Sequence, residues 1–133
     1  GEGPARADRF LLDTIGELRE ACWLADVAVV GRSFGALYGS DPMEPAALGK
    51  AVVIGPRVED FRAIVETMCA SEAIVQTGRE GLGDALRRLI EDEEARRTLG
   101  ERAARCVESK RGATEAHAAL LRRILAEDPS ACR

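Results

Sequence analysis

The sequence has few aromatic residues, a single histidine and no closely spaced cysteines. Aromatic residues make up 4% of the 133-residue chain, and the cysteines (Cys22, Cys69, Cys106 and Cys132) include no Cys-x-x-Cys pair. A zinc site needs clustered thiolates or imidazoles, so we expect no metal site and no cofactor. A chain of this length can bury a core without cross-links, which predicts reduced, buried thiols rather than disulfides.

Long apolar runs and an excess of positive charge are also missing. Apolar runs such as Val27–Val30 are far too short to cross a bilayer, and the first residues lack the pattern of a signal peptide. Lys and Arg together number 19 against 23 Asp and Glu, a net charge of −4, and the arginine pairs are interleaved with acidic residues. A nucleic-acid surface needs positive charge on one face, so we expect no nucleic-acid partner.

Short apolar runs alternate with helical periodicity along the chain. Strands are predicted over 9–12, 27–30, 51–54 and 73–76, and an amphipathic helix over Phe61, Ile64, Val65 and Met68. Helical patterns follow at Leu82–Ile90, Leu99–Cys106 and Leu120–Leu125. This alternation predicts an α/β fold: a Rossmann-like parallel sheet of about four strands, covered by helices on both faces, with a helical carboxyl terminus. We expect a single domain over 1–133.

The starts of two helices have the spacing of a capping box. Thr14 and Glu17 predict the first, in a helix that runs to about Ala25. Asp41 is the predicted cap of the second, with Pro42 in the first helical position and Glu44 in the third.

The second helix start follows a loop from Gly31 to Gly39 that is rich in glycine. Glycines let a phosphate approach the backbone, and the free N–H groups at a helix start favour an anion. A carboxylate in the first turn, such as Glu44, could accept hydrogen bonds from ribose hydroxyls. Helix capping explains the same residues without a ligand, and no complete G-x-G-x-x-G or P-loop pattern occurs.

In sequence order, these motifs resemble the carboxyl-terminal half of the bacterial Kdo (3-deoxy-D-manno-octulosonic acid) transferases. The resemblance runs from about Arg9 to Leu125, and its motifs are Asp13–Leu18, Gly31–Ser33, Asp41–Lys50 and Gly55-Pro56. These enzymes have the two-domain GT-B glycosyltransferase fold and transfer Kdo from CMP-Kdo to lipid A precursors in lipopolysaccharide biosynthesis. The resemblance implies an incomplete donor-binding domain, and a first residue that is Gly1 rather than Met also leads us to expect a piece of a longer protein.

The resemblance also implies which residues bind the nucleotide sugar. Glu44 corresponds to the ribose-binding carboxylate, and the turn Gly31, Arg32, Ser33 to part of the phosphate cradle. Ser40 and Asp41 belong to the same predicted site. Gly16 and Glu17 occupy a family motif that faces the donor cleft, although capping explains Glu17 equally well.

The sequence departs from the family pattern within these motifs. The family has two glycines at Gly31-Arg32, a Gly-Gly-x-Asn run at 38–41 and an aromatic-Asn-Phe element at 58–61. Asp41 places a negative charge beside an anionic donor, which Arg32 or Arg57 would offset. A GT-B transferase that uses another nucleotide sugar, and a non-catalytic α/β interaction module, therefore remain alternatives.

The catalytic base of the family lies in the amino-terminal domain, so no catalytic residue is expected here, and His117 is predicted to be an ordinary helix residue. The implied partners are a CMP-sugar donor and, through the full enzyme, a lipid A precursor at the cytoplasmic side of the bacterial inner membrane. Membrane association is expected only through the amino-terminal part. The isolated chain is expected to be soluble and inactive, and to form homo-oligomers through an unpaired sheet edge.

Overall fold

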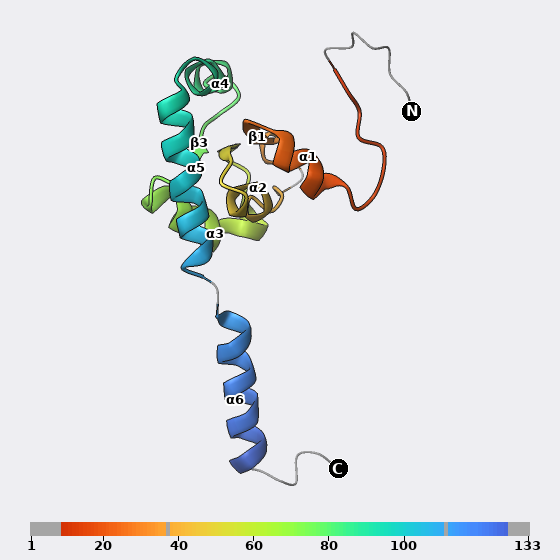
Figure 1. Ribbon diagram of the computed structural model, residues 1–133, viewed down its shortest axis with the longest axis vertical. Helices are drawn as coiled ribbons and strands as arrows, with labels where there is room; N and C mark the ends of the chain where they lie inside the picture. Colours follow the sequence, from red (N-terminus) through yellow and green to blue (C-terminus); the bar gives the residue numbers. More distant parts are fainter. Residues whose placement is uncertain (1–8, 37, 111, 128–133) are drawn as a thin grey trace.

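The structure, a computed structural model, describes residues 9–36, 38–110 and 112–127. Its parallel three-stranded sheet has the order β1-β2-β3, with β1 at Val27–Val30, β2 at Ala51–Ile54 and β3 at Val75–Gln76 (Figure 1). β1 pairs with β2 along its whole length, from Val27 with Ala51 to Val30 with Ile54. β3 pairs with the last part of β2. The predicted α/β class is therefore confirmed.

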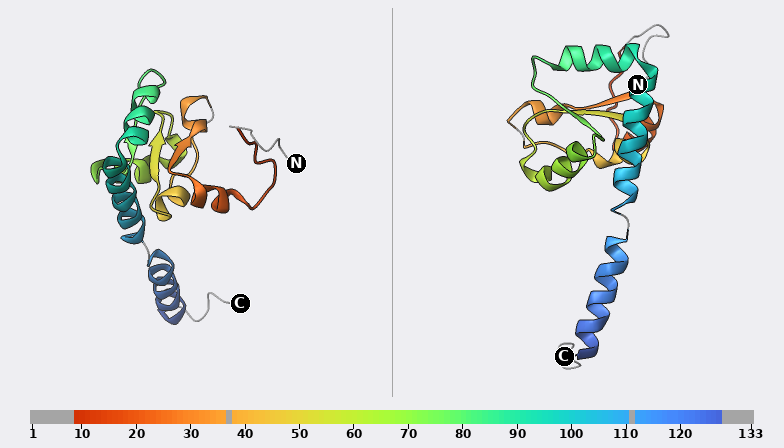
Figure 2. Two further views of the ribbon diagram at one scale, coloured as in Figure 1. Left: turned by 45° about the horizontal axis from the view of Figure 1, so that its top comes forward. Right: turned by 90° about the vertical axis from the view of Figure 1, so that its left-hand side faces the viewer.

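One helix precedes the first strand, and helices follow each of the strands. They are α1 (Leu18–Leu24), η1 (Gly31–Phe34), α2 (Met43–Ala47), η2 (Glu59–Phe61), α3 (Arg62–Ala70), α4 (Leu82–Glu91), α5 (Glu93–Glu108) and α6 (Ala113–Glu127). The helices predicted from residue 82 onward are all present. α6 extends away from the α/β body in every view (Figures 1 and 2).

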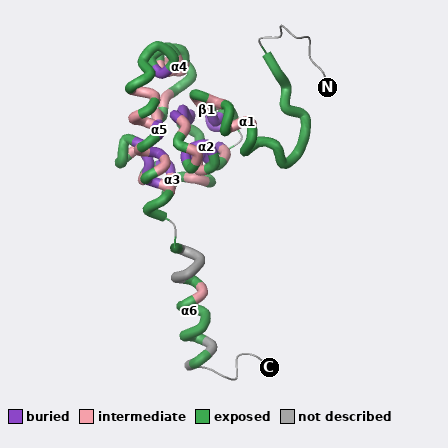
Figure 3. Tube along the Cα trace, viewed as in Figure 1, coloured by how far each residue is buried: buried purple, intermediate pink, exposed green. Residues whose placement is uncertain are grey.

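The core is built around β2, whose residues are all buried. Val52 and Ile54 belong to a buried cluster that also contains Val65 and Met68 of α3 and Ala103 and Cys106 of α5. On the opposite face of the sheet, Ala51 and Val53 pack with Leu89 of α4. The buried residues gather around the sheet in Figure 3. An apolar run with no polar position thus forms the central strand, as expected when helices cover both faces.

The coverage of β1 differs from the prediction. Val30 is buried in the core, but Val29 remains 41% exposed. α4 reaches Val27 on that side of the sheet, as part of the cluster around Leu89, and leaves Val29 uncovered. β1 is also an edge of the sheet formed by the described residues.

The predicted strand at 9–12 is wrong. Residues 9–13 have no regular secondary structure, and Phe10 and Leu11 are 82% and 87% exposed. An apolar run becomes a strand only where a neighbouring strand supplies ladder hydrogen bonds, and no ladder of the described sheet includes these residues. The sheet therefore has three strands instead of about four.

The strand predicted at 73–76 is shorter than expected. The backbone N–H of Ala73 donates to the carbonyl of Met68 at 2.8 Å, within the turn that ends α3. Ala73 and Ile74 are buried in the core but belong to no strand, and pairing with β2 begins at Val75.

The capping prediction at Thr14 is also wrong. α1 begins at Leu18 with Glu17 as its N-cap, and no side chain caps it. The Thr14 hydroxyl donates to the Glu17 carboxylate, so the two side chains bond to each other and not to backbone N–H groups.

The cap at α2 is partly as predicted. Asp41 Oδ1 accepts a hydrogen bond from the Met43 N–H at 2.8 Å, although the residue directly before the helix is Pro42. Glu44 makes no hydrogen bond within the described part of the chain, so the reciprocal half of this capping box is absent there.

Candidate functional site

The loops that follow the strands meet at one edge of the sheet, because parallel strands all end there. These loops are η1 after β1, residues 55–58 after β2 and residues 77–81 after β3. In α/β sheets this edge is where ligands bind. Hydrogen bonds join all of these loops.

Ser33 joins the first two loops. Its side chain is fully buried. Its hydroxyl donates to the Val30 carbonyl and accepts from the Gly55 N–H at 2.6 Å. Its carbonyl accepts from the Arg57 N–H at 3.0 Å. The Ser33 hydroxyl is therefore engaged within the fold, and this residue shapes the edge instead of offering its side chain to a ligand.

Gly55 lies at the closest approach between these loops. A Cβ atom at this position would lie 2.4 Å from the Ser33 carbonyl oxygen, which no real side chain allows. On its other side, Gln76 Nε2 donates to the Gly55 carbonyl at 3.2 Å. Arg79 Nε donates to the Phe34 carbonyl at 2.8 Å, which ties the third loop to the first. Gln76 and Arg79 were missed in the sequence, although their position at the end of a strand is a usable signal.

The segment that leads into α2 runs beside the second loop. Gly39 has a φ of +95°, and a Cβ there would lie 2.8 Å from the Arg57 carbonyl oxygen. The Arg57 guanidinium lies over the Tyr38 ring, 5.7 Å from its centroid. Ser40 is half-buried and Asp41 is exposed. The structure therefore brings Ser40 and Asp41 to the same edge as Arg57.

Arg57 is already engaged in an ion pair. Its Nε lies 2.7 Å from Glu59 Oε1. The Glu59 backbone N–H lowers the pKa of the Glu59 carboxyl most, and Arg57 lowers it further. The positive charge of Arg57 therefore offsets the negative charge of Glu59, so Arg57 compensates the negative charge of Asp41 less than an unpaired arginine would.

Glu44 lies in the first turn of α2 with an exposed side chain. The charge of Glu44 acts on Cys22 in α1. Burial raises the pKa of the Cys22 thiol most, the negative charge of Glu44 raises this pKa further, and the positive charge of Lys50 lowers it. Lys50 itself donates to the Trp23 carbonyl at 2.7 Å. Both oxygens of Glu44 thus remain available as hydrogen-bond acceptors on this side of α2, within the described structure.

The remaining predicted residues divide into two groups. Gly31 and Arg32 are exposed at the start of η1, and the space beside the Gly31 Cα is open. Gly16 and Glu17 lie in the exposed segment before α1, which leads away from the body (Figure 1). No described hydrogen bond joins Gly16 or Glu17 to the strand-end loops.

The described residues include no candidate metal cluster and no candidate membrane span. Over 9–36, 38–110 and 112–127, no group of three or more His, Cys, Asp or Glu is placed to hold a metal ion. His117 is exposed on α6. None of the helices in these ranges has the length and apolar character needed to cross a membrane.

Several known proteins are similar to this chain in sequence, although no protein-family profile matches it. A 3-deoxy-D-manno-octulosonic acid transferase of Bordetella pertussis is 36% identical over 127 residues, which are 94% of this chain and 28% of that protein. Its counterpart in Chlamydia muridarum is 30% identical over 96 residues, which are 71% of this chain and 22% of that protein. The chain therefore spans about a quarter of the length of these curated relatives.

A solved structure matches the fold. It is the C-terminal CMP-Kdo binding domain of WaaA from Acinetobacter baumannii, with a TM-score of 0.68 and 26% sequence identity. The match covers 72% of this chain and 51% of that domain chain. Sequence and structural similarity thus agree on one family and on its carboxyl-terminal domain.

Proposed function

We propose, on the premise that this chain belongs to the Kdo transferase family, that it binds the nucleotide of CMP-Kdo at the strand-end loops. The observation that carries the proposal is the structural match of this chain to a CMP-Kdo binding domain. The hydrogen-bonded loops also lie at the edge of the sheet where α/β sheets bind ligands. The role of the chain would be to hold the donor nucleotide.

The strand-end loops offer groups suited to each part of CMP. Exposed backbone N–H groups at Gly31 and Arg32 would donate hydrogen bonds to the phosphate, because open space beside Gly31 lets an anion approach closely. Glu44 would accept hydrogen bonds from the ribose hydroxyls with its unpaired carboxylate. Ser33 would act through its backbone and by fixing η1 against Gly55.

In the full enzyme, this chain would supply the leaving-group side of an inverting transfer. An acceptor hydroxyl of a lipid A precursor would attack the anomeric carbon of Kdo, with its proton passing to a carboxylate base of another domain, and CMP would leave. The isolated chain would then bind nucleotide without catalysing transfer. The full enzyme would act at the cytoplasmic side of the bacterial inner membrane.

A transferase with another nucleotide donor is the second candidate. Asp41 places a carboxylate at the strand-end loops, and the nearby Arg57 is paired with Glu59. A donor whose groups donate hydrogen bonds to Asp41 would suit this arrangement better than a second anion would.

Titration of the isotope-labelled chain with CMP, UMP and GMP separates these candidates in two-dimensional NMR spectra. Binding of CMP-Kdo predicts that millimolar CMP shifts the amide signals of Gly31, Arg32 and Glu44 more than equal UMP or GMP does. Larger shifts with another nucleotide would favour the second candidate. No shifts with any nucleotide would contradict both and favour a non-catalytic interaction module.

A further inference from the structure

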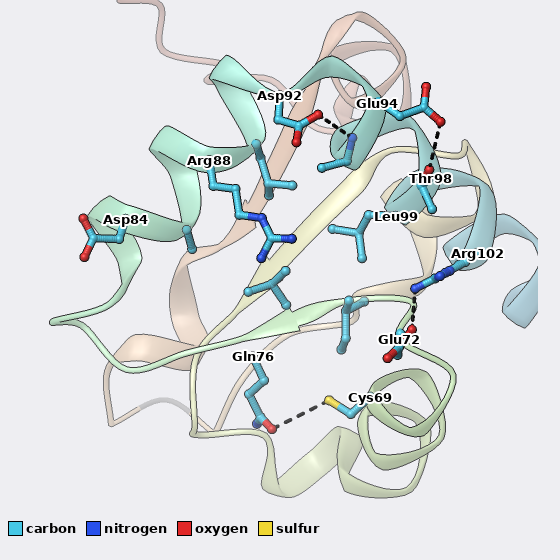
Figure 4. A pocket seen from close by; sticks show the side chains of 15 residues that line it. Cys69, Glu72, Gln76, Asp84, Arg88, Asp92, Glu94, Thr98, Leu99 and Arg102 are labelled. Carbon is cyan, nitrogen blue, oxygen red and sulfur yellow. Dashed lines mark hydrogen bonds and ion pairs between the residues drawn. The ribbon is translucent and has the colours of Figure 1, made fainter.

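A hollow lies along the outer side of β3, between α3, α4 and α5. This β3-edge pocket has a volume of about 990 Å³. Figure 4 shows it from close by, with side chains of all of these elements converging on it. Its volume is at the upper end of the range of small-molecule sites, about 300–1,000 Å³.

The floor of the β3-edge pocket is apolar. Val75 comes from β3, Ile74 from the residue directly before it, Leu89 from α4 and Leu99 from α5. Ile74 and Leu89 are almost fully buried, so the floor is part of the packed core. A ligand seated here would cover the apolar atoms of Val75 and Leu99 that remain exposed, because these two residues are half-buried.

The acidic side chains around this floor already have partners. Asp84 pairs with Arg87 at 2.7 Å, Asp92 accepts from the Ala95 N–H at 2.9 Å, Glu94 pairs with Arg97 at 2.8 Å, and Glu72 pairs with Arg102 at 2.5 Å. Arg88 is different, because its side chain makes no hydrogen bond or ion pair within the described residues. In Figure 4 its guanidinium points toward the middle of the pocket, above the apolar floor. Among the charged side chains that line this pocket, Arg88 is thus the one that has no hydrogen-bond or ion-pair partner within the described residues.

We propose that the β3-edge pocket binds a small amphipathic carboxylate, with its apolar body on the floor and its carboxylate on Arg88. A guanidinium matches a carboxylate with parallel hydrogen bonds, and the apolar floor strengthens that attraction by excluding water. A neutral ligand with the same body would leave Arg88 without a partner. A cationic one would meet its charge directly.

The test uses decanoate, below its micelle-forming concentration, as the probe of the 133-residue chain with labelled methyl groups. Decanoate should shift the methyl signals of Ile74, Val75, Leu89 and Leu99. Arg88→Gln should weaken its binding about tenfold, because a charge-assisted hydrogen-bond pair is lost. The matched control is Arg105→Gln, whose exposed arginine lies near Glu101 on α5, and neither of these residues lines the pocket. This control should bind decanoate as the unmodified chain does.

Decanol and decyltrimethylammonium provide the remaining comparisons, with the same alkyl chain and a neutral or positive head. The proposal requires that both bind at least about tenfold more weakly than decanoate. It is overturned if decanol binds as tightly, if Arg88→Gln leaves decanoate binding unchanged, or if the shifts appear at the methyl groups of Leu24 instead. Because CMP plays no part in these titrations, they succeed or fail independently of the proposed donor site.

Discussion

The Ser33 hydroxyl accepts a hydrogen bond from the Gly55 N–H at 2.6 Å, although the two residues lie 22 positions apart. The same hydroxyl donates to the Val30 carbonyl at the end of β1. One buried side chain therefore ties the end of β1 to the loop after β2. These hydrogen bonds restrain the shape of the strand-end loops, which lowers the ordering cost of binding a ligand there.

Replacement of Ser33 should act mainly on stability. Ser33→Ala leaves the buried Gly55 N–H without its partner, so the free energy of unfolding should fall by about 1–3 kcal/mol. Urea unfolding followed by circular dichroism measures this change. The control is Ser71→Ala, whose exposed hydroxyl donates to the Thr67 carbonyl at the end of α3 and should cost less than about 1 kcal/mol. Equal losses in the two variants would contradict the structural role of Ser33.

Sequence pattern predicted the strands that are covered by helices. The run Ala51–Ile54 is wholly apolar and forms the buried centre of the sheet. The run 9–12 is similarly apolar in three positions but forms no strand, because a strand also needs a partner, and periodicity does not report one.

The candidate site was predicted less completely than the fold. Gly31 and Gly39 indicated the loop. The structure places Gly31 at the end of β1 and Gly39 beside the loop after β2. The role of Ser33 could not be read from its neighbours, because the Gly55 N–H that it binds is distant in sequence. The hydrogen bond from Arg79 to the Phe34 carbonyl could not be predicted either, because these two residues lie 45 positions apart.

Replacement of Glu44 should act on affinity. Glu44→Gln keeps the size of the side chain but removes the charge that would hold the ribose hydroxyls, so CMP should bind about tenfold more weakly. The melting temperature should change little, since Glu44 makes no hydrogen bond within the described residues. Calorimetric titration of this chain measures the affinity. Glu66→Gln, an exposed replacement on α3, is the control and should leave CMP affinity unchanged.

The Arg57–Glu59 pair should make the free energy of unfolding depend on pH in the acidic range. The folded state lowers the pKa of the Glu59 carboxyl. The stability that the ionised Glu59 contributes is therefore present above the ordinary glutamate pKa of about 4.3, and it is lost as the pH falls through the pKa of Glu59 in the folded state. Glu59→Gln should therefore be less stable than the unmodified chain at pH 7, and this difference should shrink toward pH 2. Urea unfolding across that range tests the sign. A difference that grows on acidification would contradict it.

Exposed apolar residues near β1 should promote self-association. Trp23 and Leu24 are 67% and 83% exposed on α1, and β1 is an uncovered edge of the described sheet. The average mass from light scattering should rise with concentration. The double variant Trp23→Ser, Leu24→Ser should reduce this rise, whereas Ile90→Ser, which removes an exposed apolar residue from α4, should not. A monomer at millimolar concentration would contradict the prediction.

A crystal structure of this chain with CMP tests the proposed donor site most directly, because it locates the nucleotide. We predict the phosphate against the backbone of Gly31 and Arg32, and the ribose hydroxyls within hydrogen-bond distance of Glu44. CMP bound elsewhere on the chain, with these residues free of it, would contradict the assignment of the strand-end loops as the donor site.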